Sequence, residues 1–252
     1  MNLKYLIKIT KIEDLNKIAY LFDDIRFYMG KSVLEGIMGT AYVDDLMNPK
    51  FAILIINSYC FISGTVKKEI LRDILYELKE YKIIPDNVNK AIIKKEFSNY
   101  FNEKNRYSFY KKTNFDSEKL EQYINKLDSN YKIIEINSTI ADEIRTNKFI
   151  NITNNYQENG VGCCCVTDNK IIGVASSNIV YKNGIEVNIK VDENFRKKGI
   201  GTALASYLIL MCINRNLNIS WDAANLISVE LAKKVGFKYY GSYCIYTYNE
   251  KR

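Results

Sequence analysis

The sequence predicts an α/β fold of the α+β type, built as two lobes, and three observations support this. Runs with the two-residue period of strands are followed by stripes with the period of helices. The 252 residues are 47% apolar, which supplies a core for one large domain or two small ones. A polar stretch at residues 112–130 divides the chain. We therefore expect lobes at residues 1–115 and 116–252.

The first lobe is predicted as a smaller α/β unit. Its expected elements are a helix at residues 12–27, a strand pair at 41–43 and 51–63, an amphipathic helix carrying Ile70, Ile74, Leu75 and Leu78, and a strand at 107–111. This order faintly mirrors that of the second lobe, so the first lobe is expected to be a degenerate copy. Its role is expected to be either structural or to cover the substrate.

The second lobe begins with an antiparallel meander. The predicted elements are strands at residues 131–136, 162–167, 171–177 and 185–191, with a helix at 139–144 after the first. Asp168-Asn169 and Asn183-Gly184 are typical turn pairs that would join the last three strands. Together these strands predict a mixed, mostly antiparallel sheet with flanking helices.

The period changes from that of a strand to that of a helix after Gly201. Apolar positions then recur at helical spacing, at Leu204, Tyr207, Leu208, Met211 and Cys212. A short strand is expected at residues 217–221, a second helix at 225–234 and a final strand at 240–248.

Composition excludes several classes of function. The chain has no histidine, which excludes Ser-His-Asp and Cys-His mechanisms and zinc sites that need imidazole. Its six cysteines show no metal-binding spacing, so no metal site is predicted and the thiols are expected to be free and buried. The sequence shows no signal peptide and no apolar run of about 20 residues, which predicts a soluble cytoplasmic protein without membrane contact.

The most informative segment lies between the strand at 185–191 and the helix that follows it. It reads Arg196-Lys197-Lys198-Gly199-Ile200-Gly201-Thr202. Two glycines allow a ligand to approach the backbone, and the first-turn N–H groups of the helix form a binding site for phosphate. Arg196, Lys197 and Lys198 add positive charge. The alternative is a solvated basic loop without a ligand.

In its context, this R-x-x-G-x-G run resembles the acetyl-coenzyme A motif of the GNAT N-acetyltransferase superfamily. A second stretch, Trp221-Asp222-Ala223-Ala224-Asn225 with Ser228, Leu231, Ala232, Lys234 and Gly236-Phe237, resembles the fifth strand and following helix of GNAT proteins. The two stretches together are similar to a bacterial GNAT subfamily of two-lobed acetyltransferases. The resemblance covers about residues 160–240 and implies a GNAT fold.

The resemblance also implies acetyl-CoA as cofactor and an acyltransferase activity toward a primary amine. Backbone amides of Lys197, Lys198, Gly199, Ile200, Gly201 and Thr202 would hold the pyrophosphate, with Arg196 beside them. Ile189, Lys190 and Val191 would offer strand-edge groups to the pantetheine arm, and Asn225 and Ser228 would contact it. Asn225 is equally well explained as a helix N-cap.

Amine acetylation needs a general base and benefits from a general acid. Freeing the lone pair of an alkylammonium at neutral pH costs about 4 to 5 kcal/mol. Glu186 is the first candidate base and Asp222 the second; either could instead be a structural charge or a cap. Many GNAT enzymes use a tyrosine seven residues after the motif asparagine as acid, and that position is Ala232 here. Tyr239, Tyr240, Tyr243 and Tyr246 are untested substitutes, and unassisted departure of the thiolate is the alternative.

Other functions stay open at this point. A non-catalytic acyl-CoA sensor would also keep the cofactor motif and lack the acid. The net charge of +7 and 20 tyrosines could suit nucleic acid, but the lysines are dispersed, so no nucleic-acid partner is expected. The expected partner is a small-molecule or peptide amine, and a homodimer is left open.

Overall fold

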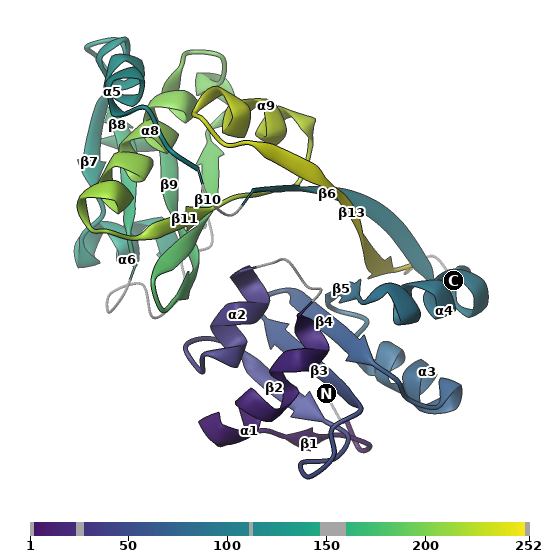
Figure 1. Ribbon diagram of the computed structural model, residues 1–252. Helices are drawn as coiled ribbons and strands as arrows, with labels where there is room; N and C mark the ends of the chain where they lie inside the picture. Colours follow the sequence, from purple (N-terminus) through teal and green to yellow (C-terminus); the bar gives the residue numbers. More distant parts are fainter. Residues whose placement is uncertain (1–2, 24–27, 111–112, 147–159, 250–252) are drawn as a thin grey trace. The chain divides into compact units, whose positions relative to one another are not determined.

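The computed structural model describes residues 3–23, 28–110, 113–146 and 160–249. It divides into two compact units, one of residues 1–106 and 243–252 and one of residues 107–242. Strands β6 (Phe101–Phe109) and β13 (Tyr239–Tyr248) contribute residues to both units. Separate domains at residues 1–115 and 116–252 stay a prediction. Figure 1 shows the chain coloured from its amino to its carboxyl end.

The first unit is built on antiparallel strands followed by a parallel crossover. Its elements are β1 (Ile7–Lys8), α1 (Ile12–Ile18), the 3-10 helix η1 (Ala19–Phe22), α2 (Tyr28–Leu34), β2 (Thr40–Val43), β3 (Phe51–Ile56), β4 (Tyr59–Gly64), α3 (Lys68–Glu77), β5 (Lys82–Pro85) and α4 (Asn87–Glu96). Strands β1 to β4 pair antiparallel in sequence order, β5 is parallel to β4, and β13 is antiparallel to β5.

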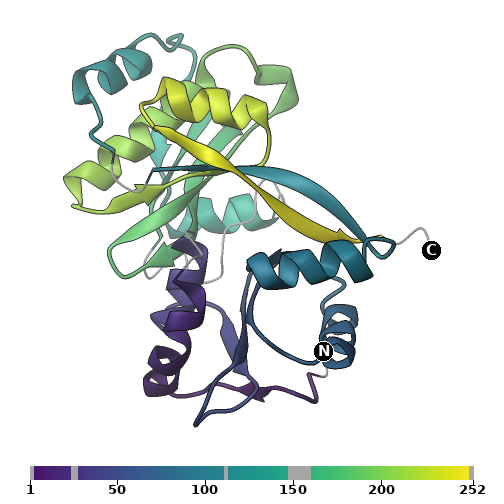
Figure 2. The same cartoon turned by 45° about the vertical axis from the view of Figure 1, so that its right-hand side comes forward.

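Both faces of this sheet are covered, which explains why β3 is buried at every position. Helices α3 and α4 lie on one face and α2 on the other (Figure 2). The predicted stripe is confirmed at Ile74, Leu75 and Leu78, which join one cluster with Phe51 and alternate residues of β3 and β4. Leu71 is buried in the same cluster, although it was not predicted, and Ile70 is only partly buried. The expected single strand at 51–63 is wrong: Asn57, at a φ of 49°, makes the tight turn between β3 and β4.

A charged cluster joins α4, β6 and β13 within the first unit. Glu103 accepts hydrogen bonds from the Cys244 thiol and the Tyr246 hydroxyl, both at 2.8 Å, and pairs with Lys94 at 3.0 Å. These donors lower the pKa of Glu103 to about 2 from its usual 4.5, with the Cys244 bond the largest cause.

This depressed pKa predicts an acid-dependent loss of stability. The Glu103 contribution is present in full above its usual pKa of 4.5 and is lost as pH falls toward about 2. We expect Glu103→Gln to destabilise the protein at pH 6, and its stability difference from wild type to shrink toward pH 3. Urea unfolding at both values measures this; a difference that does not change with pH would contradict it.

The second unit contains a similar order of strands and helices. Its elements are α5 (Ser117–Asn125), β7 (Lys132–Glu135), α6 (Ser138–Thr146), β8 (Gly162–Thr167), β9 (Lys170–Tyr181), β10 (Gly184–Val191), the 3-10 helix η2 (Glu193–Phe195), α8 (Ile200–Asn214), β11 (Asn218–Ser220), β12 (Asp222–Ala223) and α9 (Leu226–Lys234). Five strands form one sheet in the order β11-β10-β9-β8-β7, in which only β11 runs parallel to its neighbour. The predicted meander is confirmed.

One of the two predicted turns is placed differently. Asp168 and Asn169 both have positive φ, 47° and 59°, and join β8 to β9 as expected. At the next hairpin Gly184 pairs with Tyr181, so the turn consists of Lys182 and Asn183 and the predicted Asn-Gly turn is wrong. Gly184 has a packing role instead, because an added Cβ would lie 2.3 Å from the Asn218 carbonyl oxygen.

The core of the second unit explains the run of three cysteines. Alternate residues of a strand face opposite sides, so Cys163 and Cys165 join the α8 cluster while Cys164 packs with α6. Helix α8 is buried over more of its circumference than the predicted stripe, because α5 packs against it as well as the sheet. All six cysteines are free and five are buried, as predicted.

The two units share one order of elements. Each has a first strand, one or more helices, three further antiparallel strands, a helix, a strand parallel to the last of these, and another helix. The faint mirroring in the sequence therefore corresponds to a repeated topology. In the described residues, no helix combines the length and apolar character needed to cross a bilayer.

Candidate functional site

Strands β10 and β11 pair over a short length and then part. Their parallel register runs from Gly184–Asn218 to Glu186–Ser220, where β11 ends. Strand β10 continues to Val191, and a bulge against β9 falls between Glu186 and Val187. Residues 187–191, including the predicted Ile189, Lys190 and Val191, thus extend beyond the pairing with β11. A strand edge in this position can hydrogen-bond an extended ligand.

The segment after β10 turns the chain sharply into α8. Asp192 accepts a hydrogen bond from the Asn194 N–H at 3.0 Å, and Lys197 and Gly199 have φ values of 63° and 82°. Gly199 is the N-cap of α8 and provides no side-chain cap. The N–H groups of the first turn therefore lack a side-chain acceptor at the N-cap, and the helix dipole is positive there.

The two motif glycines differ from glycines that the packing requires. A Cβ added at Gly199 meets no atom within 4 Å, and at Gly201 its nearest neighbour is Val191 Cγ2 at 3.7 Å. By contrast, a Cβ at Gly173 would lie 2.8 Å from Leu204. Packing of this chain therefore does not require glycine at 201.

The basic side chains of the loop are exposed and make weak contacts. Arg196 Nη2 lies 3.1 Å from Glu193 Oε1, and Lys198 Nζ lies 3.3 Å from the Tyr131 hydroxyl. Exposed pairs of this kind contribute about 0 to 1 kcal/mol, so a stronger anion can displace them. All three cations are exposed and immediately precede the start of α8 in the chain.

Asn225 is the N-cap of α9. Its side-chain oxygen accepts a hydrogen bond from the Ser228 N–H at 2.9 Å. The Ser228 hydroxyl in turn accepts from the Trp221 indole at 3.0 Å, a contact that no sequence pattern indicated. The cap uses the amide oxygen of Asn225, which leaves its NH₂ group as the part suited to a ligand.

Substitutions of Asn225 can separate its role as a helix cap from its expected role in binding a ligand. We expect Asn225→Ala to lower the free energy of unfolding by about 1 kcal/mol through loss of the cap. Asn225→Asp keeps an acceptor at the cap and removes only the NH₂ donor, so stability should stay near wild type. Thermal unfolding of both variants checks this; equal destabilisation by Asp and Ala would contradict the separation.

The two candidate bases lie near the end of the β10–β11 pairing. Glu186 is opposite Ser220 in register and is only 5% exposed, so it is not a solvated strand charge. Asp222 follows two residues after Ser220, is half-buried, and pairs with Ser108 in the register of β12 and β6. Glu186 therefore occupies the point where the two strands separate.

The residue at the position of the usual acid cannot donate a proton to the thiolate. Ala232 is fully buried in α9, where it packs in the core. Tyr239 and Tyr240 are 40% and 43% exposed in the second unit, whereas Tyr243 and Tyr246 belong to the first unit. Burial and the Glu103 carboxylate raise the pKa of Tyr246, which makes its hydroxyl a poor proton donor.

Comparison with known proteins gives a consistent result. A family model described as GNAT acetyltransferase matches residues 19–246. An uncharacterized N-acetyltransferase, YdfB, of Bacillus subtilis (strain 168) is 27% identical over 111 residues, which span 43% of this chain and 42% of that protein.

Two solved structures extend the comparison to nearly the whole chain. A GCN5-related N-acetyltransferase-like protein of Streptococcus suis 89/1591 has a TM-score of 0.84 at 26% identity, covering 94% of this chain and 99% of that one. A tandem GNAT protein from the clavulanic acid biosynthesis pathway has a TM-score of 0.57 at 10% identity, covering 96% and 97%, and shows a shared fold.

Proposed function

Since the chain belongs to the GNAT acetyltransferase family, we propose that it transfers an acetyl group from acetyl-CoA to a primary amine of a small molecule. The observation that carries this proposal is the uncapped first turn of α8 beside the open part of β10. The second unit would hold the cofactor. The chain would then have the acyltransferase activity that its family has.

The donor set fits the chemistry of coenzyme A. The backbone N–H groups of residues 197–202 would donate to the pyrophosphate, and the exposed side chains of Arg196, Lys197 and Lys198 would screen its charge. The edge of β10 at Ile189, Lys190 and Val191 would bind the amide groups of the pantetheine arm. The Asn225 NH₂ group and the Ser228 hydroxyl would contact the same arm from the start of α9.

The described residues suggest how the chain promotes transfer. Glu186, acting directly or through water, would accept the proton of the incoming ammonium, with Asp222 as the second candidate. The backbone N–H near Val191 would donate to the thioester carbonyl oxygen, where negative charge develops. With Ala232 at the acid position, the thiolate would leave unassisted or with help from Tyr239 or Tyr240.

The test is calorimetric titration of the full chain with acetyl-CoA, followed by release of free thiol with a panel of small primary amines. Binding and turnover with one class of amine are expected. Failure of the folded protein to bind acetyl-CoA would overturn the proposal. Binding without turnover on any amine would instead favour an acyl-CoA sensor, which the absence of the usual acid also permits.

A further inference from the structure

The first unit contains a cavity that the proposed transfer does not use. Its volume is about 540 Å³. It is lined by residues 3–5, by residues 72–77 of α3, and by Phe97, Tyr100, Phe101 and Tyr248. Every lining residue belongs to the first unit, while the glycine loop and Glu186 belong to the second. The volume is in the range of sites for small organic ligands.

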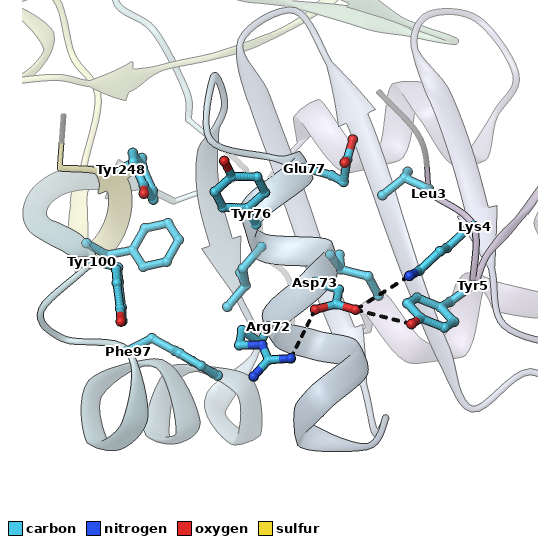
Figure 3. Close-up of a pocket in the computed structure, with 13 residues that line it drawn as sticks. Leu3, Lys4, Tyr5, Arg72, Asp73, Tyr76, Glu77, Phe97, Tyr100 and Tyr248 are labelled. Atoms are coloured by element: carbon cyan, nitrogen blue, oxygen red, sulfur yellow. Dashed lines mark hydrogen bonds and ion pairs between the residues drawn. The ribbon is translucent and has the colours of Figure 1, made fainter. Parts of the chain in front are cut away.

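One side of this cavity is aromatic (Figure 3). Phe97 and Phe101 are buried, and Phe101 packs edge-on against Tyr248 with ring centroids 5.7 Å apart. Tyr100 also lines the cavity but is 53% exposed, so much of its ring is accessible. A planar apolar group could therefore pack against the buried Phe97 and Phe101 and against the accessible ring of Tyr100.

The other side carries charges of both signs. The Asp73 carboxylate accepts a hydrogen bond from the Tyr5 hydroxyl at 3.1 Å and lies 3.4 Å from Arg72 and 3.9 Å from Lys4. In Figure 3 Lys4 and Tyr5 lie across from Phe97, Tyr100 and Tyr248, with Asp73 on α3 between them. These ion pairs are long and exposed, so contacts with a ligand can replace them at little cost.

We propose that this cavity binds a small aromatic zwitterion of the aromatic amino-acid class. The ring would lie against Tyr100 and the buried phenylalanines. The ligand carboxylate would face Lys4 and Arg72, and its ammonium would face Asp73. An acyl chain would make no polar contacts with the charged side, and a phosphate ligand would need an excess of positive charge.

Calorimetric titration of the full chain with L-tryptophan tests the proposal. Tyr100→Ala is expected to weaken binding by about 3- to 10-fold, the effect of losing one aromatic pair. Tyr110→Ala is the matched control, because Tyr110 is also 53% exposed but lies outside the cavity. No binding by the wild type, or equal loss in both variants, would overturn the proposal.

Two analogues test the charged side. Tryptamine lacks the carboxylate and 3-indolepropionate lacks the ammonium, so each should bind about 2- to 5-fold more weakly than L-tryptophan. Asp73→Asn should weaken L-tryptophan and tryptamine but not 3-indolepropionate, and an equal effect on all three would overturn the assignment of Asp73. Acetyl-CoA titration of the same variants reports on the second unit, so the two proposals can fail separately.

Discussion

Gly201→Glu is expected to weaken acetyl-CoA binding by at least about 100-fold, because a carboxylate in the first turn of α8 would occupy and repel the pyrophosphate position. The protein should nevertheless fold. Gly201 does not have a positive φ, its added Cβ makes only ordinary contacts, and an acidic residue stabilises a helix N-terminus. Titration calorimetry measures the affinity, and circular dichroism checks the fold.

Gly241→Glu is the matched control for this substitution. Gly241 lies in β13 within the second unit, and an added Cβ there meets no atom within 4 Å, so this substitution too creates no close contact at Cβ. We expect this variant to bind acetyl-CoA as the wild type does. If Gly201→Glu retains wild-type affinity, the glycine loop is not the pyrophosphate site.

Glu186→Gln is expected to lower kcat by about 100-fold or more, the usual contribution of a positioned general base. Glutamine keeps the shape of the buried side chain and removes its ability to accept a proton. Acetyl-CoA affinity should stay unchanged, since Glu186 lies before the part of β10 that extends beyond β11. Steady-state kinetics with the best amine from the panel measure this effect.

The pH dependence of the rate distinguishes a base from a structural carboxylate. If Glu186 accepts the proton, the pH profile of kcat/KM should change in Glu186→Gln. The rise that follows ionisation of this carboxyl is lost, and only the rise that follows deprotonation of the amine remains. A loss of kcat with an unchanged pH profile would indicate that Glu186 supports the strand junction. Asp222→Asn, analysed in the same way, then tests the second candidate.

The second unit was predictable because its signals are local. Strand and helix periods, the Asp168-Asn169 turn and the Asn225 cap each depend on a few neighbouring residues, and each was found as expected. The glycine motif was recognisable because it lies between a strand and the N-terminus of a helix, where backbone N–H groups can bind phosphate. The family match confirms the fold and the acyltransferase class. The site residues and the role of the first lobe stay predictions.

The first unit was less predictable because both faces of its sheet are buried. A strand covered on both sides loses its alternation, so β3 and β4 appeared as one apolar run and the turn at Asn57 was missed. The helix α4 was also missed. Its Asp86 cap, which accepts from the Asn89 N–H at 2.7 Å, was available in the sequence as a helix start signal.

The sequence by itself determined most element types of the second unit, the glycine loop and the family, since these follow from spacing within short segments. Tertiary structure decided where β11 stops beside β10, that Glu186 is buried at that point, and that Tyr246 is tied to Glu103. It also brought residues 3–5, α3 and Tyr248 around one cavity. These features depend on contacts between residues far apart in the chain, which no local period encodes.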